Sequence, residues 1–86
     1  MTQNIFYRTK AAQEHTALAR STFYAYIAQG LLPPPIKIGK RSSAWLVYEI
    51  VAVNKARILG KSNEEIKALV RSLVAARSHL GEDSND

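Results

Sequence analysis

The chain has 86 residues, of which 47% are hydrophobic and 22% are charged, and it contains no cysteine. This length suits one small domain, and the composition is that of a folded globular protein. The lack of cysteine excludes disulfides, thiolate chemistry and cysteine-ligated metal sites. No apolar run is long enough to cross a membrane, and the first ten residues lack the apolar stretch of a secretory signal, so we expect a cytoplasmic protein.

The positive charge is concentrated in the first half of the chain, and the net charge is +5. Residues 1–45 contain six Lys or Arg and one Glu, whereas residues 46–86 contain six basic and six acidic side chains. The whole excess therefore lies before residue 46, as expected of a protein that contacts a polyanion such as DNA or RNA on one side. A chance distribution of solvated charges would give the same numbers, so local patterns have to decide between the two.

A helix-turn-helix is predicted over about residues 9–30. Thr9 fits the N-cap of a first helix that runs to about Leu18. A second helix is expected from about Arg20 to Gln29, and Gly30 is the residue type that commonly ends a helix in the left-handed conformation. Because so few residues separate the two helices, they form one helix-turn-helix unit.

A small β-hairpin, which we call the wing, is predicted over about residues 35–46. Three consecutive prolines at 33–35 cannot continue a helix and hold the chain extended. Two short β-type runs then flank the basic turn Gly39-Lys40-Arg41-Ser42, as in a hairpin. The turn and Lys37 are expected to face solvent or a ligand. The wing side chains expected to face the core are Ile36, Ile38 and Trp45.

Two further helices are predicted, over about residues 47–59 and 63–79. The inner face of the first is expected at Val47, Ile50, Val51, Asn54 and Ile58, and its neighbours Lys55 and Arg57 are expected to face out. The second begins with a capping box formed by Ser62 and Glu65 and is strongly amphipathic. The expected fold class is mainly α with a small β-hairpin, a winged helix-turn-helix with an added C-terminal amphipathic helix. The single domain would span residues 1–80, with a lead-in at 1–7 that covers the core and a disordered acidic tail at 81–86.

The second helix of a helix-turn-helix enters the major groove with its N-terminal residues nearest the base edges. An arginine there can pair in a bidentate way with guanine, and hydroxyl side chains suit phosphates or base edges. Lys10 and the wing would add contacts to phosphates, although each of these residues would also suit a plain surface or packing role. The candidate DNA-binding residues are Lys10, Arg20, Ser21, Thr22, Tyr24, Ala25, Lys37, Lys40, Arg41 and Ser42.

The runs Thr16–Tyr24 and Ile36–Arg41, with Gly30-Leu31-Leu32-Pro33 between them, resemble the AlpA-like phage regulators. These are small MerR-type winged-helix proteins related to excisionases. The resemblance covers about residues 8–58. Its most specific parts are Arg20-Ser21-Thr22-Phe23-Tyr24 and the Gly39-Lys40-Arg41 turn with Trp45.

This resemblance implies a sequence-specific double-stranded DNA-binding protein of a mobile element. Such a protein acts as a transcriptional regulator, or as a recombination directionality factor (excisionase) that helps an integrase, or as both. Double-stranded DNA would be its partner and an integrase a further one, in the cytoplasm at the nucleoid. The family usually has Gly where Ala17 stands and Ser where Ala19 stands, and a basic residue is common at the position of Ala25.

The sequence leaves a second function open, that of a protein-interaction adaptor acting through the C-terminal helix. The apolar positions of that helix approximate a short heptad seam, which would allow self-association through residues 63–80, and the same residues would equally serve to cover the small core. An enzyme is disfavoured, because paired carboxylates, a glycine-rich phosphate loop and metal-ligand spacing are all missing from the sequence. No cofactor, metal site or membrane insertion is predicted.

Overall fold

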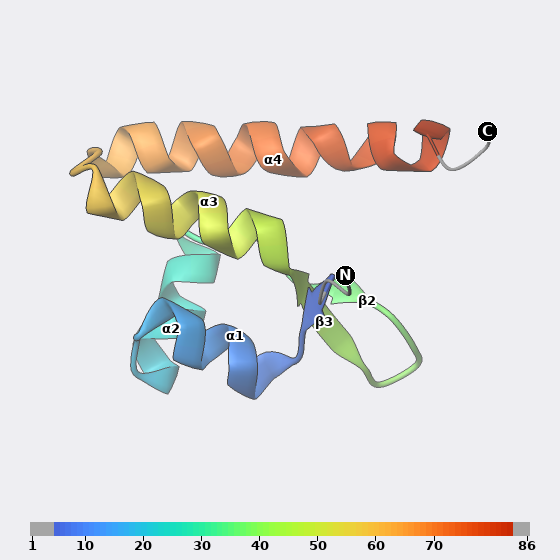
Figure 1. Ribbon diagram of the computed structural model, residues 1–86. Coiled ribbons are helices and arrows are strands. Elements are labelled where there is room, and N and C mark those ends of the chain that lie inside the picture. The colour runs from blue at the N-terminus through green and yellow to red at the C-terminus, as the bar shows by residue number, and fades with distance from the viewer. Residues whose placement is uncertain (1–4, 84–86) are drawn as a thin grey trace.

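A computed structural model describes residues 5–83 of the chain, with side chains described as far as His79. In this part, α3 (Val47–Ile58) and α4 (Asn63–Asp83) run side by side, α1 (Thr9–Thr16) lies against α3 on the side away from α4, and the short strands lie at one end of α3 (Figure 1). A mainly helical winged helix-turn-helix with an added C-terminal helix is therefore confirmed. The elements are β1 (Phe6–Tyr7), α1 (Thr9–Thr16), α2 (Arg20–Ala28), β2 (Ile36–Lys37), β3 (Ser43–Leu46), α3 (Val47–Ile58) and α4 (Asn63–Asp83).

The turn between α1 and α2 contains a strained residue. Ala17 has φ 61° and ψ 23°, the left-handed conformation, and its backbone N–H donates to the Glu14 carbonyl at 3.1 Å. This turn ends α1 at Thr16, two residues before the predicted end. The predicted N-cap was also wrong, because Arg8 occupies that position and Thr9 is the first residue of the helix. Ala19 is the N-cap of α2, and it has no side-chain oxygen to bind the free N–H groups there.

The wing is part of a three-stranded antiparallel sheet in which β3 is the central strand. On one side of β3, Phe6 pairs with Leu46, so the expected lead-in contains the strand β1. Tyr7 packs against the core as expected, whereas Ile5 and Phe6 are exposed. On the other side Ile36 pairs with Ala44. Ile38 was expected to face inward, but its side chain is 44% exposed, because β2 ends at Lys37 and the alternation of faces ends with it.

The core is formed where α2, β3, α3 and α4 meet. The rings of Phe23 and Trp45 lie 5.3 Å apart, and α4 contributes Ile66 and Val70. The predicted inner face of α3 was partly wrong, since Val51 and Ile58 are exposed. The helix is packed against α1 and α4, so its buried positions recur at helical spacing on that side. The buried residues of α3 are Glu49, Ile50, Val53 and Ala56.

The capping box that starts α4 is confirmed. The Ser62 N–H donates to Glu65 Oε1 at 2.8 Å, and the Glu65 N–H donates to Ser62 Oγ at 3.1 Å. The helix continues to Asp83, so residues 81–83 are helical where a disordered tail was expected. Gly81 is tolerated there at a cost of about 1 kcal/mol relative to Ala, and no proline follows to end the helix. Residues 84–86 of the expected tail lie outside the described residues.

Two substitutions in the helix-turn-helix are expected to stabilise the protein. Ala17→Gly removes the left-handed strain of an L-residue, and Ala19→Ser adds the missing cap. Each should raise the free energy of unfolding by about 1 kcal/mol, measured by urea denaturation. The control is Ala28→Gly in α2, which has ordinary helical geometry and should lose stability. A loss of stability in Ala17→Gly would show that the turn is not strained as described.

The capping box makes stability depend on pH. The backbone N–H and the side chain of Ser62 both lower the pKa of Glu65 below its usual value. A carboxylate with a lowered pKa stabilises the folded state above its unfolded pKa, and this contribution is lost as the pH falls through the folded pKa. Ser62→Ala should raise the pKa of Glu65 part of the way back, measured by NMR titration, and cost about 1 kcal/mol of stability. Ser78→Ala on the same helix should change neither quantity.

Candidate nucleic-acid interface

One face of α2 is buried and the other is free. Phe23 is fully buried against Trp45, which fixes the rotation of the helix about its axis. Thr22 is half-buried beside it. The side chains left exposed on α2 include the remaining candidates of this helix, Arg20, Ser21, Tyr24 and Ala25.

Arg20 and Tyr24 lie one turn apart and contact each other. The Arg20 guanidinium carbon is 5.9 Å from the centre of the Tyr24 ring, within the range of a cation–π interaction. The edge-to-face packing of Tyr24 on buried Phe23, with ring centres 5.3 Å apart, holds that ring in place. Tyr24 therefore restricts the orientation of the Arg20 side chain.

The N-terminus of α2 is open to an anion. Ala19 offers no side-chain cap, and no acidic residue lies in the first turn of the helix. The backbone N–H groups and the positive end of the helix dipole therefore face solvent without a competing carboxylate in that turn. This is the electrostatic setting in which a phosphate group is bound.

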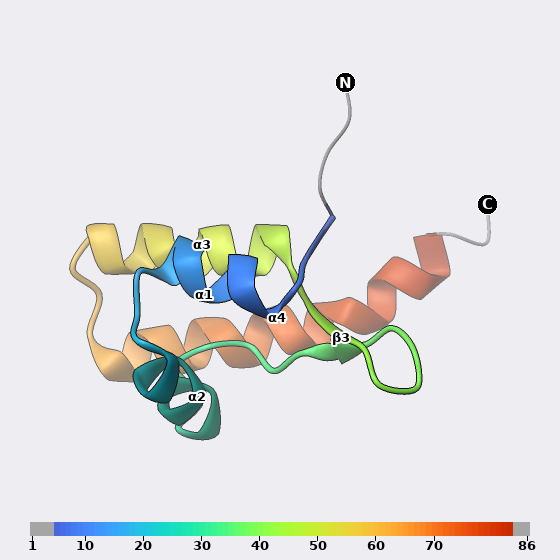
Figure 2. The same ribbon diagram turned by 90° about the horizontal axis from the view of Figure 1, so that it is seen from below.

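The wing presents the second group of candidates. Lys37, Lys40 and Arg41 are exposed, and Ser42 is half-buried and accepts the Ile38 N–H at 2.9 Å through its carbonyl. The loop of the wing and α2 project on the same side of the molecule in both views (Figures 1 and 2). Lys10 is exposed near the start of α1, on a different element from the other candidates.

Contacts behind α2 were missed by the sequence analysis. Arg57 was expected to face out, but its guanidinium lies over the Tyr26 ring at 4.9 Å from the centre, and its Nη2 is buried without a described hydrogen-bond partner. Asn54 Nδ2 donates to the His15 carbonyl at 2.9 Å and ties α3 to the end of α1. Asn54 and Arg57 of α3 thus contact both helices of the helix-turn-helix. In the sequence, the only sign of this shared role is their spacing of three residues, which places them on one side of the helix.

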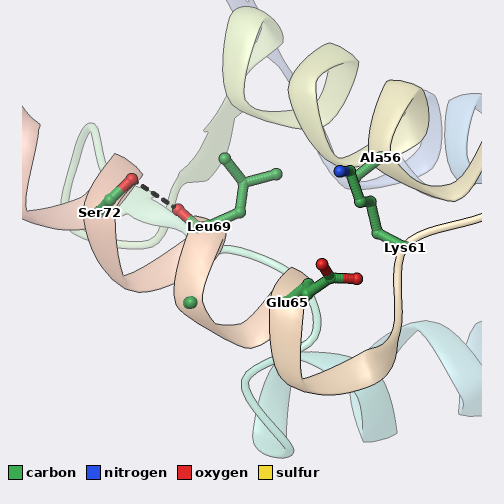
Figure 3. A pocket seen from close by; sticks show the side chains of 6 residues that line it. Ala56, Lys61, Glu65, Leu69 and Ser72 are labelled. Carbon is green, nitrogen blue, oxygen red and sulfur yellow. Dashed lines mark hydrogen bonds between the residues drawn. The ribbon is translucent and has the colours of Figure 1, made fainter. Parts of the chain in front are cut away.

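A separate hollow lies between the end of α3 and the start of α4 (Figure 3). Its volume is about 410 Å³, and it is mostly apolar. Glu65, its one carboxylate, is used in the capping box. The residues that line it are Ala56, Lys61, Glu65, Ala68, Leu69 and Ser72.

Neither a metal centre nor a membrane span is found in the part of the chain that the structure describes. No three His, Asp or Glu side chains in this part lie close enough together to hold a metal ion. None of its helices is both long enough and apolar enough to cross a membrane.

The sequence was also compared with those of known protein families. The family model described as "Prophage CP4-57 regulatory protein (AlpA)" matches residues 5–53, which is more than half of the chain and includes α1, α2 and the wing. The chain belongs to the AlpA family. Membership places it among phage regulatory proteins and implies DNA as its partner.

A viral relative supports the same membership. The uncharacterized protein ORF88 of enterobacteria phage P4 is 36% identical over 61 residues, which cover 71% of this chain and 69% of the relative. No solved structure matches the chain significantly. The AlpA match ends within α3, so α4 lies beyond it.

The contact between Arg20 and Tyr24 can be tested without a ligand. Tyr24→Leu removes the ring and should abolish the ring-current shift of the Arg20 side-chain protons in NMR spectra, whereas Tyr24→Phe keeps the ring and should preserve most of that shift. Tyr26→Phe serves as the matched aromatic control on the same helix and should leave Arg20 unchanged. Equal Arg20 shifts in the wild type and Tyr24→Leu would mean that the two side chains do not stack.

Proposed function

We propose that this AlpA-family protein is a sequence-specific double-stranded DNA-binding regulator of a mobile element. In this proposal α2 lies in the major groove with Arg20, Ser21 and Thr22 nearest the bases. The observation that carries the proposal is the exposed face of α2, with an open N-terminus and a basic wing projecting on the same side. This is the arrangement by which a winged helix-turn-helix spans a groove and the adjacent backbone.

The remaining candidates would position the protein on DNA. Lys37, Lys40, Arg41 and Ser42 of the wing, together with Lys10, contact phosphates, whereas Tyr24 orients Arg20 and contacts the backbone. Ala25 leaves room for a base edge or a thymine methyl group. All of these side chains except the half-buried Ser42 are exposed.

The biological outcome would be transcriptional control, excision of the element with an integrase, or both, at the nucleoid. The similarity to a protein of phage P4 supports an origin in a mobile element. To test this, the purified protein is used to capture fragmented host DNA near physiological salt, and the captured DNA is sequenced. Promoter enrichment supports transcriptional control, and enrichment of repeats beside an attachment site supports excision. Enrichment no greater than that of a basic protein of equal charge would contradict specific binding.

An adaptor function through α4 is less well supported by the geometry. Ile66 and Val70 are buried in the core of the same chain, and Leu69, Leu73 and Val74 pack against it. Self-association through residues 63–80 would have to expose part of this packed face. We therefore propose that α4 serves to cover the core of the domain rather than to bind a partner.

Direct readout and phosphate contact predict different responses to mutation. Arg20→Ala should cost about 1–3 kcal/mol on the preferred site and relax the sequence preference. Lys40→Ala should weaken binding to all sequences alike and reduce the slope of log affinity against log salt by about 1. Both are measured by fluorescence titration at several salt concentrations.

Two exposed basic residues away from α2 and the wing serve as matched controls. Arg71→Ala on α4 removes the same charge as Arg20→Ala, and Lys55→Ala on α3 removes the same charge as Lys40→Ala. Both controls should bind nearly as the wild type does. If Arg20→Ala and Arg71→Ala have equal effects, α2 does not read the sequence.

A further inference from the structure

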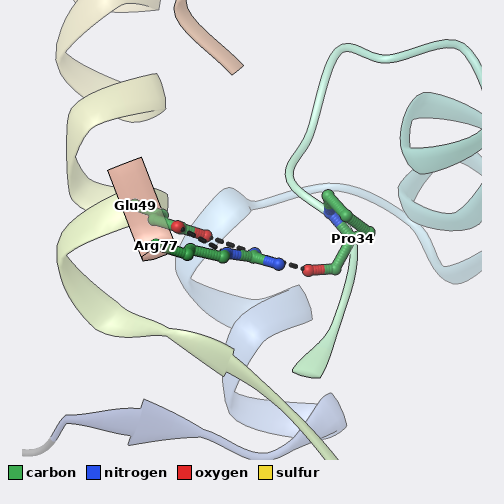
Figure 4. A network of polar contacts seen from close by, with 3 residues as sticks. All are labelled: Pro34, Glu49 and Arg77. Atoms are coloured by element: carbon green, nitrogen blue, oxygen red, sulfur yellow. Dashed lines mark hydrogen bonds and ion pairs between the residues drawn. The ribbon is translucent and has the colours of Figure 1, made fainter. Parts of the chain in front are cut away.

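A single arginine of α4 makes three hydrogen bonds at the base of the wing (Figure 4). Arg77 Nε donates to Glu49 Oε2 at 2.8 Å, and Arg77 Nη2 donates to Glu49 Oε1 at 2.6 Å. The same Nη2 also donates to the Pro34 carbonyl at 2.8 Å. Glu49 is fully buried, and the side chain of Arg77 is only 19% exposed.

The two partners of Arg77 lie at the two ends of the wing. Pro34 comes two residues before β2 begins, and Glu49 comes three residues after β3 ends. Within the wing the two strands are short, and their described pairing is Ile36 with Ala44 and Lys37 with Ser43. β3 is also held by its pairing with β1 and by Trp45 in the core, whereas β2 pairs only with β3 and through only two residues. The direction of β2 therefore depends on how the segment that leads into it is held.

The prolines transmit the restraint to β2. Pro33 is buried, and Pro34 and Pro35 restrict the backbone that leads directly into Ile36. Consecutive prolines form a stiff, extended segment that keeps its direction over several residues. Fixing the carbonyl of Pro34 therefore fixes the direction in which β2 leaves the domain.

We infer that Arg77 is a positioning residue that closes the base of the wing and holds its basic turn in place on the side of the molecule on which α2 also projects. This inference rests on the proposed DNA-binding function for its purpose, but the clamp itself is a property of the free protein. The residue that supplies the clamp lies beyond the part of the chain that matches the AlpA family model, which ends at residue 53. The clamp thus gives α4 a role in the interface without touching DNA.

The first test measures the wing without DNA. Removing only one partner would leave the other charge buried and unpaired, so the variant is Arg77→Met with Glu49→Met, which replaces both by apolar side chains of similar length. Hydrogen exchange of the Ile38 N–H, which closes the turn by bonding to Ser42, should become about tenfold faster as the hairpin opens more often. The Phe23 N–H of α2 serves as the internal reference and should be little changed.

Two further variants keep this test decisive. Arg71→Met removes an exposed arginine from the same helix and should leave Ile38 exchange as in the wild type. Arg77→Lys retains the charge, but its single ammonium cannot reproduce the three bonds, so Ile38 exchange should rise even if the double variant fails to fold. Wild-type exchange of Ile38 in Arg77→Lys and in a folded double variant would overturn the inference.

The second test asks whether the clamp serves DNA binding. Lys40→Ala is made in the wild type and in the Arg77→Met/Glu49→Met protein, and DNA affinity is measured for all four proteins. If the clamp positions the wing, the loss caused by Lys40→Ala should be smaller in the unclamped protein. Equal losses in the two backgrounds would contradict the inference. No loss from Lys40→Ala in either background would contradict the proposed role of the wing, while the exchange result would still decide whether the clamp exists.

Discussion

The buried carboxylate of Glu49 is the constraint on which the arrangement of this small domain depends. A carboxylate with no exposed surface costs several kcal/mol unless a cation and hydrogen bonds compensate it. Arg77 meets that requirement with two bonds, and only when α4 lies on α3 in one register. The ion pair adds little net stability over an apolar pair, but any other register of α4 would leave the carboxylate unpaired. It therefore selects one packing of α4 from several that an amphipathic helix would allow.

Core side chains fix the orientation of the helix-turn-helix on its buried side. A chain of 86 residues has a thin core, so each large side chain holds several elements. Trp45 lies on the central strand and packs on Phe23 of α2, although its own Nε1 is buried without a described partner. The Arg57 guanidinium lies over the Tyr26 ring, and together these contacts orient α2.

Features with a local cause were predictable from the sequence, and features with a tertiary cause were not. The Ser62–Glu65 capping box and the left-handed Gly30 depend on neighbouring residues and were predicted correctly. The strand β1 and the outward side chain of Ile38 depend on strand pairing, which no local pattern specifies. The buried pair had a weak signal, since Glu49 interrupts an apolar run and Arg77 lies on the same helical face as Val70. Neither signal identifies the partner residue, because Glu49 and Arg77 are 28 residues apart in the sequence.

Stability and the proposed DNA contact make opposite demands on the start of α2. A Ser at position 19 would bind the first N–H groups of the helix with its own hydroxyl. With Ala19 those N–H groups have no side-chain partner, and in the proposed complex they would be available to a DNA phosphate. The missing cap lowers the stability of the free protein, and under the proposed function part of that loss would be recovered on binding. Arg20 and Ser21 are exposed and lie outside the core that orients α2, so under the proposed function they could vary with the DNA site without disturbing the fold.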